Sequence, residues 1–260
     1  MLLLVDAGNT RIKWALMDRT IPDPVMGAWH ASGSVARSEA EQLVEIWRSF
    51  SIGRVMISNV AGAGLHDQLQ IAVFRALGTK PVAVEWFAST ETAGGVRNAY
   101  QKPAQLGCDR FAAAIGAHAL FPERPLLVAT CGTATTLDAV SADGTFIGGM
   151  ILPGLGLMAS ILAKNTAQLP EVALHADDLQ PFADHTDAAI VSGCLAAQTG
   201  AIARAYAALS TMYPDTPVSC ILAGGAADLI APHLNISYER VDNLVLIGLQ
   251  TVAIHTHSTC

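Results

Sequence analysis

Short apolar runs alternate with turn-forming residues along this chain. The first run is Leu2 to Val5, a polar turn follows, and a second run extends from Ile12 to Met17. Short apolar segments bounded by Gly, Asn and Asp are typical of β-strands. The N-terminus is therefore predicted to be two strands joined by a tight turn. Further strands are predicted at Arg54 to Ser58, Val82 to Val84, Leu126 to Ala129, Thr135 to Val140, Thr145 to Gly149 and Val218 to Ala223.

Other segments repeat their apolar residues at the spacing of a helix. Ser38 and Glu41 have the spacing of a capping box before one such segment. Thr186 is predicted to cap an Ala-rich helix that runs to Leu209. Because strands alternate with helices, the sequence predicts an α/β fold. The other predicted helices are Leu65 to Leu77, Asp109 to Leu120 and Leu244 to Ile254.

Two segments share one local pattern. Val5 to Thr10 and Ala129 to Ala134 each follow an apolar strand and each lead into another. One such turn predicts no more than a hairpin, whereas two in matching contexts indicate a duplicated architecture with two similar lobes. The predicted lobes are residues 1–112 at the N-terminus and residues 113–260 at the C-terminus.

Composition narrows the class of protein. Of the 260 residues, 52% are hydrophobic and 14% are charged, so most of the chain must pack into a core. The formal net charge of −7 disfavours nucleic-acid binding but allows a small anionic ligand. The five cysteines contain no C-x-x-C pair, which is typical of reduced thiols and favours a cytoplasmic location.

One uncharged stretch, Phe146 to Ala163, is long enough to raise the question of a membrane span. Several glycines and Pro153 interrupt it, so it is predicted to be a loop between buried elements. Asp6 interrupts the apolar N-terminus, which argues against an export signal. The protein is therefore expected to be soluble, with no membrane partner.

The two repeated turns have the chemistry of a phosphate site. Glycine allows close approach of the backbone to an anion, and successive amides in a turn can surround phosphate oxygens. The hydroxyls of Thr10 and Thr133 add donors, and Asp6 is a candidate ligand for Mg²⁺, directly or through water. The sequence has no Walker loop and no G-x-G-x-x-G after its first strand. The turns therefore predict a nucleotide held between two loops of another kind.

A third candidate group lies at the end of an irregular stretch, residues 89–105. Gly107 permits a sharp turn into a helix, so Asp109 and Arg110 are expected in its first turn. In one interpretation Asp109 caps the helix and Arg110 is a solvated side chain. In the other, Asp109 is a general base for a substrate hydroxyl and Arg110 pairs with an anionic group.

Taken together, these segments resemble the type III pantothenate kinase family over nearly the whole chain. Asp6 to Thr10 resembles the family's first phosphate motif, and Cys131 to Thr136 resembles its second. Asn98 to Arg110 is similar to the pantothenate motif. Gly148 to Gly154 and Thr166 to Pro170 resemble two further family segments.

The resemblance implies the two-lobed, duplicated α/β fold of acetate and sugar kinases, heat-shock chaperone ATPases and actin. It implies a kinase that transfers the γ-phosphate of ATP to pantothenate, giving 4′-phosphopantothenate in the first step of coenzyme A biosynthesis. It also implies Mg²⁺, a monovalent cation (K⁺ or NH₄⁺), and a homodimer whose pantothenate site involves both subunits.

Site residues follow from the resemblance position by position. Asp109 would be the proton acceptor, Asp6 would hold Mg²⁺, and Gly224-Gly225 would lie near the adenosine. The ATP site would contain Asp6, Ala7, Gly8, Asn9, Thr10, Arg11, Ile12, Lys13 and Thr133. The pantothenate site would contain Tyr100, Gly107, Cys108, Asp109, Arg110 and Thr186.

One position departs from the family pattern. Thr130 stands where an aspartate usually precedes x-Gly-Thr in the second motif, next to the cation. A hydroxyl supplies no charge, so the cation site is expected to be weaker or rebuilt, with Asp138 as a candidate to compensate.

Two alternative functions stay open, a kinase for another small hydroxyl compound and a non-catalytic regulator of the same fold. Tyr100, Arg110 and Thr186 favour pantothenate, and Asp6 with Asp109 and Arg110 favours catalysis.

Overall fold

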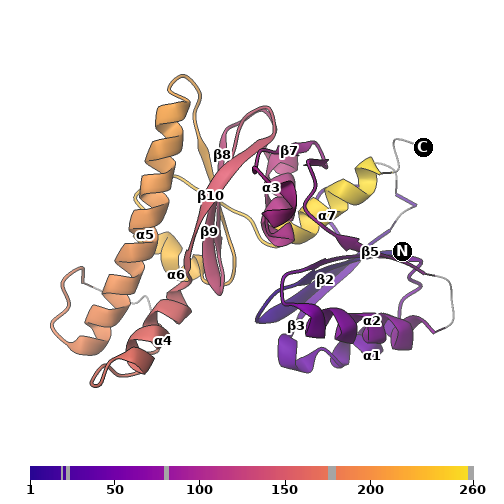
Figure 1. The fold of residues 1–260 in the computed structure, drawn as a ribbon, viewed down its shortest axis with the longest axis horizontal. Coiled ribbons are helices and arrows are strands. Elements are labelled where there is room, and N and C mark those ends of the chain that lie inside the picture. Colours follow the sequence, from indigo (N-terminus) through magenta and orange to yellow (C-terminus); the bar gives the residue numbers. More distant parts are fainter. Residues whose placement is uncertain (19, 22–23, 79–81, 175–179, 257–260) are drawn as a thin grey trace. The chain divides into compact units, whose positions relative to one another are not determined.

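The computed structural model describes residues 1–18, 20–21, 24–78, 82–174 and 180–256, which form two compact units (Figure 1). Unit 1 contains Met1–Pro122, Gly144–Phe146 and Asn243–Cys260, and unit 2 contains Glu123–Asp143 and Ile147–Asp242. The chain therefore passes between the units more than once. The lobe boundary near residue 112 stays a prediction.

Unit 1 is built on a five-stranded sheet in the order β3-β2-β1-β4-β5. The pairs β1/β2 and β2/β3 are antiparallel, whereas β1/β4 and β4/β5 are parallel. The bounds are β1 Leu2–Ala7, β2 Arg11–Met17, β3 Ala31–Ala36, β4 Arg54–Asn59 and β5 Ala83–Phe87.

Helices cover both faces of this sheet, which explains why β1 is apolar at nearly every position. Leu3 and Val5 pack in one core cluster with residues of α1 (Gln42–Arg48) and α2 (Ala63–Leu77). Leu2 and Leu4 point to the other face, in a cluster with residues of α3 (Cys108–Leu120) and α7 (Leu244–His255). Asp6 continues the Leu2–Leu4 side of the strand, so it faces the layer that contains α3.

The sheet of unit 2 has the order β12-β11-β8-β9-β10. The pair β8/β9 is antiparallel, and β11 is parallel to both β8 and β12. The first two residues of β10 belong to unit 1, where they pair with β7, which in turn pairs with β6. The bounds are β6 Thr92–Ala93, β7 Val96–Asn98, β8 Leu126–Cys131, β9 Ala134–Val140, β10 Thr145–Pro153, β11 Ser219–Ala223 and β12 Glu239–Arg240.

The two sheets have matching topology, since β8, β9, β10, β11 and β12 occupy the places of β1, β2, β3, β4 and β5. In both sheets the first two strands form an antiparallel hairpin, and the fourth strand is parallel to the first. The predicted duplication and the α/β class are therefore confirmed. The repeated turns, Gly8–Thr10 and Gly132–Thr133, lie at equivalent positions in the two units.

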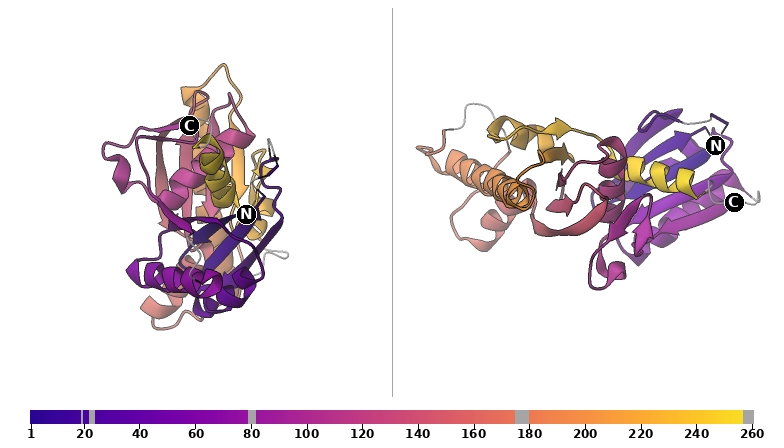
Figure 2. Two further views of the ribbon diagram at one scale, coloured as in Figure 1. Left: turned by 90° about the vertical axis from the view of Figure 1, so that its right-hand side faces the viewer. Right: turned by 90° about the horizontal axis from the view of Figure 1, so that it is seen from above.

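Helices α4 (Leu155–Asn165), α5 (Thr186–Met212) and α6 (Ala227–Ile230) pack on the sheet of unit 2 (Figures 1 and 2). Among the described residues, α5 is the helix long and apolar enough to cross a membrane by length and composition alone. Its residues Ile190, Cys194, Ile202 and Leu209 are buried in the core of unit 2. The core helix of a folded unit passes the same test, so the expected absence of a membrane partner stays a prediction.

Three local predictions are wrong. The capping box predicted at Ser38 and Glu41 does not form, because helix α1 begins at Gln42 without a side-chain cap. Instead, the Glu39 carboxylate accepts a hydrogen bond from the N–H group of Ala36, the residue before the 3₁₀ turn Arg37–Glu39. Residues 146–163, predicted to be a loop, form most of β10 and α4. Gly148 and Gly149 lie inside the strand without breaking it, and the strand ends at Pro153. The N-cap of α5 is His185, and Thr186 is the first helical residue.

The irregular stretch at residues 89–105 contains two short strands, β6 and β7, and a 3₁₀ turn, Pro103–Gln105. A further 3₁₀ turn, Ala231–His233, follows α6. The other predicted strands and helices are confirmed with small shifts at their ends. Four cysteines are free thiols, and the fifth, Cys260, lies outside the described residues. The free thiols are Cys108, Cys131, Cys194 and Cys220.

Candidate active site

The first candidate loop is the turn between β1 and β2. The N–H group of Gly8 donates a hydrogen bond to the carbonyl oxygen of Arg11 at 3.1 Å, which closes the turn. Asp6 precedes the turn on β1 and lies opposite Lys13 on β2 and Ser58 on β4. Residues that pair across strands share a face of the sheet, so these three side chains project toward the layer that contains α3.

Helix α3 begins over this face. The thiol of Cys108, its first residue, contacts the hydroxyl of Ser58 at 3.3 Å and the carbonyl oxygen of Asn59 at 3.6 Å. These contacts join the first turn of α3 to the C-terminal end of β4. Asp109, the next residue, is thereby held in the same region of unit 1 as Asp6.

The carboxyls of Asp6 and Asp109 interact. Burial and, to a smaller extent, the negative charge of Asp109 together raise the pKa of Asp6 to about 7, and Lys13 opposes the change. Burial also raises the pKa of Asp109, against the opposing effects of its hydrogen bond with the N–H group of Arg110 (2.8 Å) and of the Arg110 charge. Two carboxyls with raised pKa values in one region are typical of a functional site.

Gly107 leaves room for the Asp109 carboxylate. A Cβ atom at residue 107 would lie 2.8 Å from Oδ1 of Asp109, closer than any ordinary carbon–oxygen contact. Any larger residue would therefore displace that carboxylate from its place over the first turn of α3.

The loop before α3 is held together by one amide. The side chain of Asn98 is buried, donates hydrogen bonds to the carbonyl oxygens of Thr90 (3.2 Å) and Pro103 (3.1 Å), and accepts one from the N–H group of Tyr100 (3.1 Å). This arrangement gives a structural reason for the spacing of Asn98, Tyr100 and Pro103 in the sequence.

Arg110 is buried, with 8% of its surface exposed, so its interpretation as a solvated side chain is wrong. Its guanidinium donates a hydrogen bond to the hydroxyl of Tyr100 at 3.0 Å. The guanidinium carbon also lies 5.8 Å from the ring centroids of Tyr100 and Phe146, within the range of cation–π attraction. Arg110 and Tyr100 thus form one packed group beside Asp109.

The second candidate loop, in unit 2, follows β8. The N–H group of Gly132 donates to the carbonyl oxygen of Ala134 at 3.0 Å, which closes this turn as Gly8 closes the first. The N–H group of Gly154 donates to the carbonyl oxygen of Thr133 at 2.9 Å. The start of α4 therefore supports the loop that contains Thr133.

Thr130 lies one residue before Cys131, at the end of β8. Its hydroxyl oxygen is buried and has no hydrogen-bond partner in the part of the chain that the structure describes. Thr130 is opposite Thr136 on β9, and Asp138 lies two residues further along the same face, with 1% of its surface exposed. A hydroxyl of this kind can take a ligand, but it brings no charge to it.

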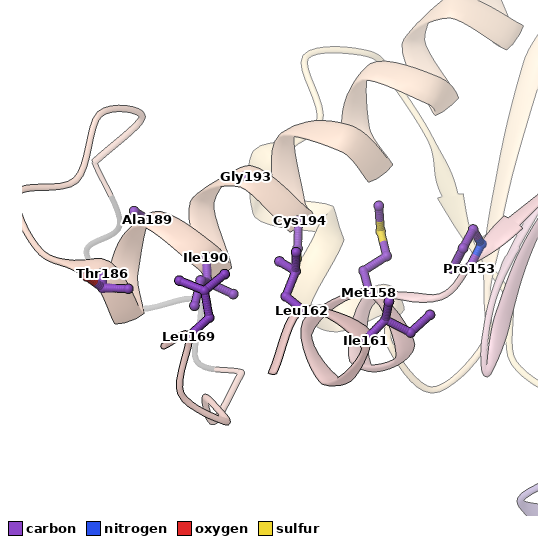
Figure 3. A pocket seen from close by; sticks show the side chains of 10 residues that line it. All are labelled: Pro153, Met158, Ile161, Leu162, Leu169, Thr186, Ala189, Ile190, Gly193 and Cys194. Atoms are coloured by element: carbon purple, nitrogen blue, oxygen red, sulfur yellow. The ribbon is translucent and has the colours of Figure 1, made fainter. Parts of the chain in front are cut away.

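Thr186, the remaining predicted substrate residue, is at the start of α5 in unit 2. It lines an apolar cavity of about 620 Å³ between α4 and α5 (Figure 3). The other lining residues are Pro153, Met158, Ile161, Leu162, Leu169, Ala189, Ile190, Gly193 and Cys194.

Within unit 1 the structure brings together Asp6, Lys13, Tyr100 and Gly107 to Arg110, whereas Thr133 and Thr186 belong to unit 2. Sequence reasoning missed Ser58 and Phe146. Each lies in an apolar strand, and only the register of the sheet shows that its side chain reaches this group.

The sequence of this chain is similar to known proteins over its full length. A model of the type III pantothenate kinase family matches residues 2–208. The chain belongs to the type III pantothenate kinase family. It is 72% identical to the type III pantothenate kinase of Janthinobacterium sp. (strain Marseille) and 70% identical to that of Herminiimonas arsenicoxydans, in both cases over 100% of each chain.

Solved structures agree on the fold of this pantothenate kinase family member. One is described as a candidate 2-dehydro-3-deoxygalactonokinase from Sinorhizobium meliloti, with TM-score 0.60, 15% identity and coverage of 98% of this chain and 99% of that one. Another is a candidate Baf-family transcriptional activator from Campylobacter jejuni, with TM-score 0.55, 16% identity and the same coverage. These likenesses confirm the predicted duplicated kinase fold.

The raised pKa of Asp6 predicts a pH dependence of stability. The unfolded chain loses this proton near the ordinary value of 3.8, whereas the folded protein keeps it until about pH 7. Protonated Asp6 therefore contributes stability that is complete below pH 3.8 and is lost as the pH rises through about 7. Asparagine cannot ionise, so the stability of Asp6→Asn does not change in this way. As the pH rises from about 5 to about 8, we therefore expect the melting temperature of Asp6→Asn to increase relative to that of the wild type. A constant difference across that range, measured by thermal unfolding, would contradict the shifted pKa.

Proposed function

We propose that this protein transfers the γ-phosphoryl group of ATP to pantothenate, which yields 4′-phosphopantothenate and ADP in the first step of coenzyme A biosynthesis. The membership of the type III pantothenate kinase family and the full-length relatives of that name support this reaction. The observation that carries the mechanism is the electrostatic interaction between Asp109, at the start of α3, and Asp6, at the end of β1.

We infer that Asp109 is the general base. Its raised pKa makes it a stronger proton acceptor than an ordinary carboxylate, which suits the removal of a proton from a primary hydroxyl. The hydroxyl oxygen of pantothenate then bonds to the γ-phosphorus, the bond from that phosphorus to the bridging oxygen of ADP breaks, and the proton stays on Asp109. We infer that Arg110 and Tyr100, which contact one another, bind the pantothenate carboxylate and chain.

For the nucleotide, we assign the phosphates to the two repeated turns, residues Asp6 to Lys13 in unit 1 and Thr133 in unit 2. Backbone N–H groups and hydroxyls of such turns bind phosphate oxygens without adding negative charge. Gly224-Gly225 would lie near the adenosine.

Mg²⁺ fits the surroundings of Asp6. A carboxyl whose ionisation is made unfavourable by burial and by Asp109 gains from a nearby cation. When bound there, directly or through water, Mg²⁺ would neutralise charge on the phosphates. Ionised Asp6 would hold the metal, while Lys13 on the neighbouring strand offsets part of the remaining negative charge.

We expect replacement of the general base to separate catalysis from binding. Asp109→Asn removes the proton acceptor but keeps its size, so kcat should fall by about a hundredfold or more while pantothenate binding is largely retained. The measurement is ADP release in a coupled assay, with and without pantothenate, beside the control Asp67→Asn, which alters an exposed carboxylate on α2.

Three other results of this assay would support different conclusions. Near-wild-type turnover in Asp109→Asn would show that another residue is the base. Wild-type turnover that does not depend on pantothenate would support a kinase for another hydroxyl compound. No turnover in the wild type would support a regulatory role.

The monovalent cation site of this chain is proposed at Thr130. The buried hydroxyl without a partner is consistent with an oxygen ligand, but the absence of charge predicts weak binding of K⁺ or NH₄⁺. Thr130→Asp adds a carboxylate, so we predict that the K⁺ concentration for half-maximal activation falls by about tenfold. Thr130→Val, which has no hydroxyl, is the matched control. An identical K⁺ response in all three proteins would place the cation elsewhere or show that it is not needed.

We further propose a homodimer, formed through unit 2. Ile151 on β10 and Leu157 and Ile161 on α4 are exposed apolar side chains, and Ile161 also lines the cavity that Thr186 lines. Clustered exposed apolar residues mark interaction surfaces. A partner on this face would bring Thr186 close to a shared pantothenate site, as the family resemblance implies.

Sedimentation velocity tests the dimer. The wild type should sediment with twice the mass of one chain, and Ile151→Glu combined with Ile161→Glu should sediment as a monomer, because two charges cannot be buried unpaired. Phe74→Glu is the matched control, since Phe74 is also exposed but lies on α2 of unit 1. A wild type that is monomeric at micromolar concentration would contradict the proposal. We also propose that the protein is cytoplasmic and that it has no nucleic-acid or membrane partner.

A further inference from the structure

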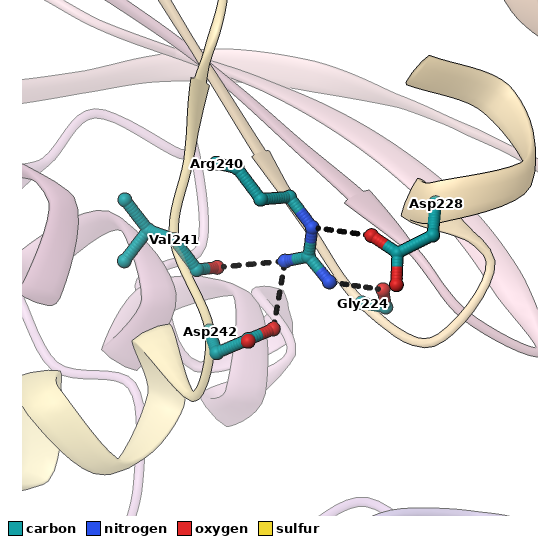
Figure 4. Close-up of polar contacts among 5 residues, drawn as sticks. All are labelled: Gly224, Asp228, Arg240, Val241 and Asp242. Atoms are coloured by element: carbon teal, nitrogen blue, oxygen red, sulfur yellow. Dashed lines mark hydrogen bonds and ion pairs between the residues drawn. The ribbon is translucent and has the colours of Figure 1, made fainter. Parts of the chain in front are cut away.

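Arg240, the last residue of β12, has its guanidinium surrounded by acceptors (Figure 4). Nε donates to Oδ1 of Asp228 at 3.1 Å, and Nη1 lies 2.7 Å from Oδ1 of Asp242. Nη1 also donates to the carbonyl oxygen of Val241 at 3.3 Å, and Nη2 donates to that of Gly224 at 3.4 Å. Two carboxylates and two backbone carbonyls of unit 2 therefore fix the orientation of one side chain.

The carbonyl of Gly224 is the contact that leads to the nucleotide loop. Gly224 has φ +95°, and a Cβ atom there would lie 2.3 Å from the carbonyl oxygen of Cys131. The N–H group of Ala226 donates to that same oxygen at 3.0 Å. Only a residue without a side chain can approach the backbone so closely in this conformation. The backbone of the turn after β11 thus packs directly against Cys131, the first residue of the Cys131–Thr133 loop.

We propose that Arg240 is a positioning residue for ATP. It holds the Gly224-Gly225 turn by its carbonyl, and through this turn it fixes the Cys131–Thr133 loop. The inference rests on the proposed function, because that function assigns the loop to the phosphates and the turn to the adenosine. Arg240 itself does not touch the nucleotide in this account.

The charges around Arg240 support a role in geometry. Asp228 and Asp242 together offset its positive charge, which leaves little attraction for phosphate. An arginine is suited to this place because its planar fork presents several donors in fixed directions, which the single ammonium of lysine cannot do. The pKa of Cys131 is raised to about 12 by burial, and the positive charge of Arg240 opposes this rise.

These contacts add little to global stability. Side-chain exposure is 82% for Asp228 and 70% for Asp242, and ion pairs so exposed contribute little to the free energy of unfolding. Loss of Arg240 should therefore leave the folded state nearly as stable and change the position of the loop. A purely structural residue would behave in the opposite way.

The test compares Arg240→Met, which keeps the length of the side chain, with Arg240→Lys, which keeps the charge. Arg48→Met is the matched control, because Arg48 forms an exposed ion pair with Glu45 at 2.7 Å in unit 1. The measurements are calorimetric titration with ADP in the presence of Mg²⁺, KM for each substrate, and the melting temperature.

We expect Arg240→Met to weaken ADP binding and raise KM for ATP by about tenfold, since misplacement of a binding loop is costly even without loss of a direct contact. KM for pantothenate and the melting temperature should stay near the wild-type values. Arg240→Lys should recover part of the ADP affinity, and Arg48→Met should behave as the wild type.

Unchanged ADP affinity in Arg240→Met, or an equal loss for both substrates, would overturn the proposal. If that variant does not fold, Arg240→Lys and Asp228→Asn decide instead, and wild-type ADP affinity in both would overturn it. Failure of the proposed function is separate, because a wild type without pantothenate-dependent turnover still reports on Arg240 through the ADP titration.

Discussion

Two carboxyls, those of Asp6 and Asp109, face one partly buried region of unit 1, and the chemistry proposed for this protein depends on them. Asp6 and Asp109 each have a pKa raised mainly by burial, and the negative charge of Asp109 makes the ionisation of Asp6 less favourable still. A folded protein keeps such an arrangement only where the remaining packing holds both groups in place. Here the central strand β1 places Asp6, and the contacts of Cys108 with Ser58 and Asn59 place the helix that carries Asp109.

The duplicated sheets place a similar turn in each unit. In each unit an antiparallel hairpin at the centre of the sheet ends in a glycine-containing turn closed by a backbone hydrogen bond. One hairpin carries the acid, Asp6, and the other carries Thr130 and Thr133. The same architecture thus supplies two turns closed in the same way, one beside a carboxylate and the other beside hydroxyls.

Much of this was predictable from the sequence, for definable reasons. Apolar runs bounded by turns located the strands, and the matching contexts of Val5 to Thr10 and Ala129 to Ala134 predicted the duplication that the strand order confirms. Local sequence patterns did not predict the features that depend on contacts between residues far apart in the chain. The side chain of Arg110 packs against Tyr100 and Phe146, and Phe146 lies on β10, far from Arg110 along the chain. The acceptors around the Arg240 guanidinium come from residues whose spacing follows no motif, so only the structure shows that they meet.

The central claim is that Asp109 receives the proton of the pantothenate hydroxyl. A crystal structure with pantothenate and a non-hydrolysable ATP analogue tests it most directly. We expect the primary hydroxyl of pantothenate to lie about 3 Å from a carboxylate oxygen of Asp109, in line with the terminal phosphate. Pantothenate bound with that hydroxyl out of reach of Asp109, while the phosphates occupy the two turns, would contradict it.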